Sequence, residues 1–258
     1  MKCIYAVILF PFFLHSCQSR NKKEDALFSM ENITRANLQT ITVEVEDFNF
    51  EDLGNFLEVT SYIQLAAEPL LASIQEIQIK NEKIYIHDKF ARIICYDMQG
   101  KMIFKIDAKG AGPGEYTDVN TFVINEQSRE LIIYDNHKQS LLFYNADNGI
   151  FFKTQKLVKP DPTAMASLGG VYYYDNRYHS NYPNDTDLYY SLLVSKNAMT
   201  MDRHYFPHND AESSYRFRPT RQPFSYNDSV LYYCRNFDNV IYELNPVSYT
   251  HLRAHETV

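Results

Sequence analysis

Three aspartates end three similar apolar segments, and their spacing could support metal chemistry. The segments are KIYIHD (83–88), ELIIYD (130–135) and GVYYYD (170–175), which end at Asp88, Asp135 and Asp175. In stacked repeats, equivalent positions point the same way, so three carboxylates could hold a divalent cation through oxygen ligands. Aspartate directly after a strand is also a common turn former, because its side chain accepts backbone N–H bonds. We favour the turn interpretation and keep the cation site as the alternative.

A tyrosine-rich stretch follows the third of these segments. VYYYDNRYHSNYPNDTDLYY (171–190) interleaves tyrosine with aspartate and asparagine. Aromatic faces beside carboxylate and carboxamide groups suit a sugar or peptide ligand, and long insertions in repeat folds often form binding surfaces. The candidate ligand-binding residues are Tyr174, Asp175, Arg177, Tyr178 and Tyr182. The alternative is that alternate tyrosines pack between repeats while their neighbours face water.

A glycine-rich stretch, KGAGPGEY (109–116), raises the possibility of a phosphate-binding loop. Such a loop needs a helix after the glycines, so that backbone N–H groups and the helix dipole meet the phosphate. Here Pro113 lacks an N–H, and the following NTFVINEQ is typical of a strand. The sequence therefore predicts a corner between two repeats, built from Gly110, Gly112, Pro113 and Gly114, with the glycines permitting tight or positive-φ geometry.

The elements that position these residues are short strands. Runs rich in Ile, Val, Tyr and Phe alternate with polar turns, and no long helical periodicity interrupts them. SVLYYC (229–234) is a fourth copy of the Asp-ended segment, with Cys234 in place of the aspartate. A period of about 40–50 residues with several strands per unit predicts an all-β fold, the β-propeller, with about four blades between residues 76 and 245.

Charge and cysteine content limit the partners. The formal net charge is −7 and no basic stripe is present, so no nucleic-acid partner is expected. Cys95 and Cys234 lie in apolar, strand-like runs, and we expect two unpaired buried thiols. His204 and His208 are four residues apart, but Pro207 between them disfavours the helix that would bring them to one face.

The N-terminus has the pattern of an export signal. Lys2 precedes an apolar run that ends in LHSC (14–17), which resembles a bacterial lipobox. Residues 1–16 are therefore expected to be a signal peptide, and Cys17 the lipidation site that attaches the protein to a membrane. Residues 17–50 are expected to form a polar tether and an N-terminal strand, and residues 51–245 a partial propeller.

The last residues differ in character from the rest. VSYTHLRAHET (247–257) resembles the in-frame translation of a transposase-type sequencing adapter. We expect the natural sequence to stop at Asn245 and residues 246–258 to be a non-native tail. On that interpretation, His251 and His255 are not candidate metal ligands.

Several of these features together resemble a known family. The lipobox, TSYIQLAAEPLLASIQEIQI (60–79), the KIYIHD unit and GAGPGEY (110–116) are similar to six-bladed β-propeller lipoproteins of gut anaerobes, relatives of the NHL-type repeat. The resemblance is strong over residues 58–157 and weaker up to 245. It implies six blades, and hence that this chain is a fragment. It implies less about function, because one fold serves many functions.

We expect a lipid-anchored module of the cell envelope, at the outer membrane, that binds a glycan, a peptide or another envelope protein. One alternative is an accessory subunit of an outer-membrane nutrient-uptake complex. The other is an envelope enzyme, a lyase or lactonase with a divalent cation in the channel, as the resemblance to NHL-like lyases implies. For that enzyme the candidate residues are His87 with Tyr85, and His137 with Arg92. No other cofactor is expected.

Overall fold

The computed structural model describes Val59 and residues 61–176, 189–208, 222–227, 230–235 and 240–244, together with the backbone of 253–256. The chain divides into two compact units, Met1–Glu31 and Asn32–Val258, and every described residue lies in the second. Within this part the fold is all-β, and no helix in it is long and apolar enough to cross a membrane. The predicted signal peptide, Cys17 and the tether lie outside the described residues.

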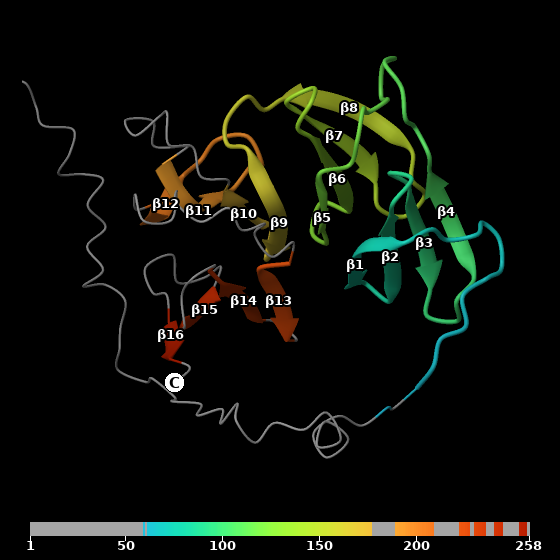
Figure 1. Ribbon diagram of the computed structural model, residues 1–258, viewed down its shortest axis with the longest axis horizontal. Coiled ribbons are helices and arrows are strands. Elements are labelled where there is room, and N and C mark those ends of the chain that lie inside the picture. The colour runs from blue at the N-terminus through green and yellow to red at the C-terminus, as the bar shows by residue number, and fades with distance from the viewer. Residues whose placement is uncertain are drawn as a thin grey trace, which may run out of the picture. The chain divides into compact units, whose positions relative to one another are not determined.

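Four sheets of four antiparallel strands form the blades of a β-propeller (Figure 1). Blade 1 contains β1 (Ile74–Lys80), β2 (Lys83–Asp88), β3 (Ile93–Asp97) and β4 (Met102–Ile106). Blade 2 contains β5 (Thr121–Asn125), β6 (Glu130–Asp135), β7 (Ser140–Asn145) and β8 (Phe151–Lys156). Blade 3 contains β9 (Pro162–Leu168), β10 (Val171–Asn176), β11 (Tyr190–Ser195) and β12 (Arg203–Pro207). Blade 4 contains β13 (Phe224–Asn227), β14 (Val230–Cys234), β15 (Val240–Leu244) and β16 (Arg253–Glu256).

The repeat predicted from sequence is confirmed. The predicted segments 83–88 and 130–135 are β2 and β6. The segment 170–175 is shifted by one residue from β10, and the segment 229–234 begins one residue before β14. Each is the second strand of its blade. The first strands of successive blades contact one another, so β1, β5, β9 and β13 are the innermost strands.

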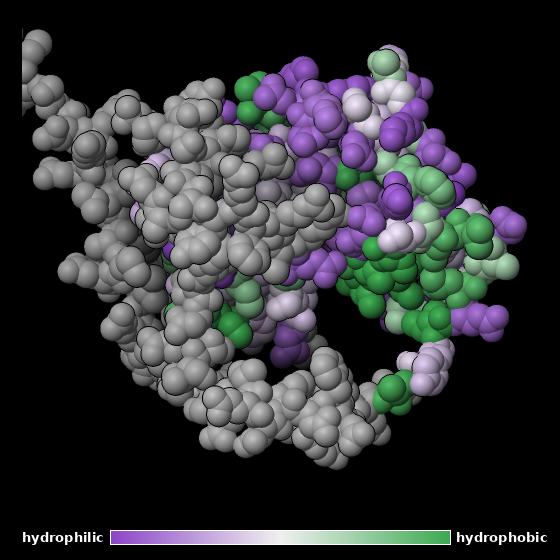
Figure 2. Space-filling view, in the orientation of Figure 1, coloured by the Kyte–Doolittle hydropathy of each residue, from purple (hydrophilic) through white to green (hydrophobic). Residues whose placement is uncertain are grey.

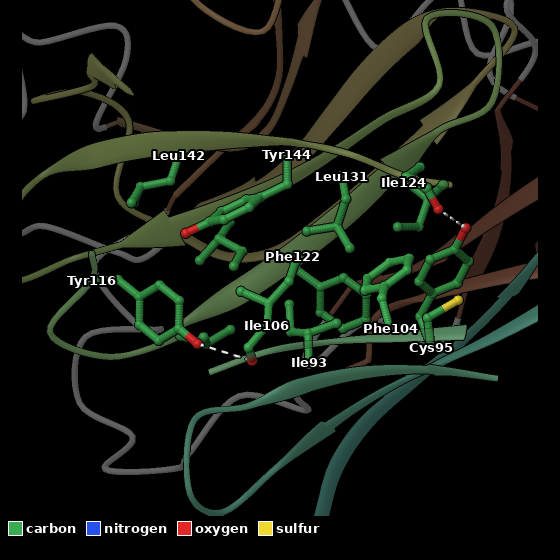
Figure 3. Close-up of a cluster of buried hydrophobic side chains, with 14 of the residues drawn as sticks. Ile93, Cys95, Phe104, Ile106, Tyr116, Phe122, Ile124, Leu131, Leu142 and Tyr144 are labelled. Carbon is green, nitrogen blue, oxygen red and sulfur yellow. Dashed lines mark hydrogen bonds between the residues drawn. The ribbon is translucent and has the colours of Figure 1, made fainter. Parts of the chain in front are cut away.

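Each seam between blades is filled by apolar side chains. Figure 3 shows the seam between blades 1 and 2, where Ile93 and Phe104 pack against Phe122 and Leu142. Because the central blades have a neighbour on both faces, their first three strands contain apolar residues at consecutive positions instead of alternating. All five residues of β5, for example, are buried.

Tyrosine hydroxyls cross the seam between blades 1 and 2 to backbone carbonyls. The Tyr116 hydroxyl donates to the Ala91 carbonyl at 2.7 Å, and the Tyr85 hydroxyl donates to that of Ala146 at 2.9 Å (Figure 3). The Tyr144 hydroxyl donates to the Gly114 carbonyl at 2.7 Å. Burial raises the pKa of Tyr116 to about 12, so this hydroxyl remains a donor at neutral pH. Each such bond contributes about 1 kcal/mol net, and leaving a partner unpaired costs more.

The stretch 109–116 turns the corner between β4 and β5, as predicted, and no helix follows it. Gly114 has φ +74°, and a Cβ there would lie 2.8 Å from the Phe151 ring. A Cβ on Gly110 would lie 2.1 Å from the Glu115 carboxylate, which accepts the Gly112 N–H at 2.6 Å. Two glycines therefore make room for the acid, and the third supplies the positive φ.

The fourth strand of blade 4 lies in the adapter-like tail. β16 pairs with β15 through its backbone, with Val240 opposite Glu256. An outermost strand has a single neighbouring strand, and many different sequences can form the main-chain hydrogen bonds with it. The presence of β16 therefore does not show that its sequence is native. The adapter origin of residues 246–258 therefore stays a prediction.

We expect Gly114→Ala to lower the free energy of unfolding by about 1–3 kcal/mol, because alanine is strained at positive φ and its methyl group meets Phe151. Chemical denaturation followed by circular dichroism measures this. Gly112→Ala is the matched control: its Cβ approaches the flexible Glu115 side chain at 3.1 Å and φ is not positive, so it should change stability by less than about 1 kcal/mol. Equal effects of the two substitutions would contradict this account of the corner.

Candidate functional site

Asp88 closes the turn after β2. Its Oδ1 accepts the backbone N–H groups of Phe90 at 3.1 Å and Arg92 at 3.3 Å, and its Oδ2 accepts that of Ala72 at 3.3 Å. The Arg92 guanidinium forms an ion pair with the same carboxylate, which is fully buried. Burial alone would raise the pKa of Asp88, but the bonds from Arg92 and from the backbone lower it below its ordinary value. The carboxylate is thus fully used by the turn and by the chain entering blade 1.

Asp135 plays the same part in blade 2. Its Oδ1 accepts the N–H groups of His137 at 3.0 Å and Lys138 at 3.1 Å, and its Oδ2 accepts that of Thr117 at 2.6 Å. Both aspartates therefore make the bonds that the turn interpretation predicts. Each also fixes the segment that leads into the first strand of its own blade.

Asp175 has a different environment. Its Oδ1 accepts the hydroxyl of Tyr233, from β14 in blade 4, at 2.8 Å, and its Oδ2 accepts the hydroxyl of Thr163 at the start of β9. The residue is 5% exposed. Burial raises the pKa of Asp175 to about 6, while the two hydroxyl bonds and the charge of Arg235 oppose this rise. Asp175 thus joins blades 3 and 4, and its burial there disfavours the charged form of the carboxylate.

Among the described residues, no group of three or more His, Cys, Asp or Glu could hold a metal ion. The three aspartates are therefore not gathered around a common cation position in this part of the chain. Two residues of the pairs proposed for an enzyme have structural partners. Tyr85 is in the seam between blades 1 and 2, and Arg92 is paired with Asp88.

Tyr174, a predicted ligand-binding residue, lies in the core. It is fully buried, its hydroxyl donates to the Ala198 carbonyl at 2.8 Å, and it packs in the seam between blades 2 and 3. Tyr172 lies in the same seam, and Tyr173 in the seam between blades 3 and 4. The tyrosines do alternate, but their neighbours face the next blade instead of water. Arg177, Tyr178 and Tyr182 lie outside the described residues.

The prediction of two buried thiols was half wrong. Cys95 is buried, and burial raises its pKa to about 12. Cys234 is exposed. It ends β14 at the position that an aspartate occupies in the other blades, so the fourth repeat lacks the turn-closing acid.

Sequence reasoning missed a cluster where the first strands end. The Lys80 ammonium lies 3.5 Å from the Glu126 carboxylate and 3.4 Å from the centre of the Tyr226 ring. The Tyr226 hydroxyl in turn accepts the Ser167 N–H at 3.0 Å and donates to the Ser167 carbonyl at 3.2 Å. One residue from each of the four blades thus meets in this cluster.

The cluster links the blades through a buried cation. Lys80 is 7% exposed, and its pKa is lowered by burial, which outweighs the opposing effect of Glu126. Its ammonium is held against an aromatic face, an arrangement that stabilises a desolvated cation. The sequence signal was the end of IQEIQIK, where a lysine follows an alternating strand, but the partners lie in distant repeats.

The fold and these contacts define the chain as a β-propeller domain in which an aspartate closes the turn after the second strand of blades 1 and 2. A family profile described as "Domain of unknown function (DUF4934)" matches residues 38–250, and the chain belongs to this family. No curated protein matches the chain.

Two solved structures are similar to the chain, and the first of them shows the same fold. A candidate exported protein of Bacteroides fragilis NCTC 9343 is 18% identical with a TM-score of 0.63, over 76% of this chain and 54% of that protein. A DUF4221 family member from Bacteroides vulgatus is 13% identical with a TM-score of 0.48, over 75% of this chain and 60% of that protein. The chain therefore spans little more than half the length of these proteins.

Asp88 and Asp175 should give opposite pH dependence of stability. The pKa of Asp88 is lowered on folding, so its contribution is present above pH 3.8 and is lost as the pH falls through the folded value. The pKa of Asp175 is raised to about 6, so its contribution is full below pH 3.8 and is lost as the pH rises through about 6.

We therefore expect Asp88→Asn to destabilise the protein by about 3 kcal/mol at pH 7, because Arg92 loses its partner, and by progressively less as the pH falls below 3.8. Asp175→Asn should remove a fall in wild-type stability of order 3 kcal/mol between about pH 4 and 6. Urea unfolding of wild type and both variants from about pH 2.5 to 8 measures these differences. Parallel profiles for the two variants would contradict the assignment.

Proposed function

We propose that the chain acts as a cell-envelope β-propeller that binds a ligand or a partner protein, and not as an enzyme. The supporting observation is the difference between blade 3 and blades 1 and 2. The second and third strands are joined by residues 89–92 in blade 1 and 136–139 in blade 2, but by 177–189 in blade 3. A long connection on a rigid repeat scaffold is a common place for a binding surface.

The start of this connection is held firmly. Asp175 is fixed by Thr163 and Tyr233, and the Asn176 side chain donates to the Tyr190 carbonyl at 3.1 Å and accepts the Asp161 N–H at 3.1 Å. Asn176, the last residue before the connection, is thus bonded to Tyr190, the first residue of β11. A loop whose two ends are fixed loses less entropy when it binds.

We propose a glycan or peptide as the ligand, because the connection carries Arg177, Tyr178 and Tyr182 among Asn and Asp residues. Tyr178→Ser with Tyr182→Ser should weaken binding to a glycan or peptide array by at least about tenfold. Truncating an aromatic anchor typically costs about 2 kcal/mol or more of binding free energy, and about 1.4 kcal/mol corresponds to a tenfold change in affinity. Phe90→Ser is the matched control, because Phe90 is an aromatic 61% exposed in the corresponding turn of blade 1. Equal binding by both variants and wild type would refute the loop as the ligand site.

We further propose that Cys17 carries the lipid anchor at the outer membrane. Support comes from the LHSC motif and from the fold shared with a candidate exported protein. Cys17→Ser should move the protein from the membrane fraction to the soluble fraction and abolish metabolic labelling with a fatty acid. Cys234→Ser, which removes an exposed thiol of the folded part, should change neither. Unchanged fractionation of the Cys17 variant would refute the anchor while leaving the ligand proposal standing.

A further inference from the structure

The outer strand of blade 2 departs from the repeat that the other strands follow. The strand registers align β8 with β4, because Cys95 lies opposite Phe104 in blade 1 and Phe143 lies opposite Lys153 in blade 2. Phe104 is 8% exposed and fills the seam with the next blade, whereas Lys153 is exposed. The packing that requires an aromatic residue in blade 1 is therefore absent at the same position of blade 2.

Two further positions of this strand change in the same direction. Ile106 is buried in the seam between blades 1 and 2, and its equivalent in blade 2 is Gln155. The next residue is Asp107 in blade 1 and Lys156 in blade 2, so the charge is reversed. Asp107 forms an ion pair at 3.1 Å with a lysine of β4, but residues 149–160 contain three lysines and no acid. In a chain with a net charge of −7, this segment is locally basic.

No carboxylate neutralises the ammonium groups of β8. The Lys156 ammonium donates to the Lys138 carbonyl at 2.8 Å, and the Lys153 ammonium lies 4.1 Å from the centre of the Phe143 ring. These two groups form no ion pair with any residue that the structure describes. A carbonyl and an aromatic ring orient the cations but leave their net charge in place.

Exposed apolar side chains accompany these lysines. A β-bulge between Phe143 and Tyr144 leaves Phe152 without an opposite residue in β7. Phe152 is 48% exposed, and Ile150 before the strand and Val158 after it are 63% and 57% exposed. Figure 2 shows mostly hydrophilic surface where Figure 1 places β8, with a small hydrophobic area beside it. Lysines and single apolar side chains are thus interspersed along one exposed edge.

We propose that this edge binds the anionic phospholipid headgroups of a membrane, with its lysines at the phosphates and its apolar side chains between the headgroups. The β8 edge, as we call it, consists of Ile150, Phe152, Lys153, Lys156, Val158 and Lys159. Cations interspersed with aromatic and aliphatic side chains suit the boundary between water and hydrocarbon. Lysines on an edge strand also discourage pairing with other strands, but that purpose needs no exposed apolar side chains beside them.

The overall charge of the protein limits how this edge can act. A net charge of −7 opposes an approach to an anionic membrane, so the attraction must come from the local lysines. The Debye length is about 8 Å at physiological ionic strength, which confines that attraction to groups close to the headgroups. Binding through the β8 edge should therefore weaken as the salt concentration rises. The proposal extends the proposed envelope location and does not require the lipid on Cys17.

Vesicle binding by a chain without the lipid tests the proposal. The chain starting at residue 18 lacks the signal peptide and Cys17, and every described residue lies in the compact unit Asn32–Val258, so its blades should be retained. It should bind equimolar phosphatidylcholine–phosphatidylglycerol vesicles at least about tenfold more tightly than phosphatidylcholine vesicles, as measured by co-sedimentation. Equal binding to both kinds of vesicle would overturn the proposal and would leave the fractionation test of Cys17 unaffected.

Two pairs of substitutions assign the binding to the edge. Lys153→Gln with Lys156→Gln should weaken binding to the anionic vesicles by about 25-fold, since each lysine near an anionic surface contributes about fivefold. Lys89→Gln with Lys101→Gln makes the same change of charge at two exposed lysines of blade 1 and should weaken binding by less than about twofold. Equal losses from the two pairs would show an effect of net charge alone and would overturn the proposal.

A third substitution separates a membrane from a soluble polyanion. Phe152→Ser should weaken binding to the anionic vesicles several-fold and leave binding to heparin unchanged, because only a membrane removes the ring from water. Phe90→Ser is the control, since Phe90 is an aromatic 61% exposed in blade 1, and it should change neither. Circular dichroism of each variant checks that the fold is retained. A Phe152→Ser variant that binds vesicles like wild type, or a chain that binds heparin as tightly as vesicles, would overturn the membrane as the partner.

Discussion

The requirement that a blade bury both faces of its sheet governs the structure. A single four-stranded sheet has two apolar faces here, and one neighbour can cover only one of them. Blade 2 meets the requirement completely, with Phe122 and Leu131 against blade 1 and Val123 and Ile132 against blade 3. This double burial explains why its strands have consecutive apolar residues and why their hydroxyl groups must find partners inside the seams.

The buried aspartates lie at or next to the ends of the second strands, where they serve the fold. At one end, Asp88 and Asp135 satisfy backbone N–H groups that the turns would otherwise leave unpaired. At the other, Lys80 reaches Glu126 and Tyr226 and links three blades. Groups used in this way are poor candidates for binding or catalysis. Ligand recognition is therefore expected in connections that are longer than a tight turn, such as residues 177–189 of blade 3.

Much of the fold could be predicted because the repeat is local. KIYIHD and its copies contain the strand, its apolar character and its closing aspartate within six residues. The candidate site was harder to predict, because the residues that determine burial and contact there come from distant parts of the sequence. Tyr174 looks like a surface aromatic in a tyrosine-rich stretch, and only the neighbouring blade shows that it is buried. The Lys80 cluster joins residues from four different repeats, and no motif spacing marks it.

Asp175 connects the seam between blades 3 and 4 to the start of the long connection in blade 3. In blades 1 and 2 the acid is stabilised by backbone donors of its own blade, which require nothing from the next blade. Among the described residues, Asp175 accepts the hydroxyls of Thr163 and Tyr233, so its environment depends on the seam with blade 4. Burial raises the pKa of Asp175 to about 6, which outweighs the opposing effects of the two hydroxyl bonds and of the Arg235 charge. Because this acid also fixes the start of the long connection, any change that moves blade 4 relative to blade 3 alters the support of the proposed binding loop.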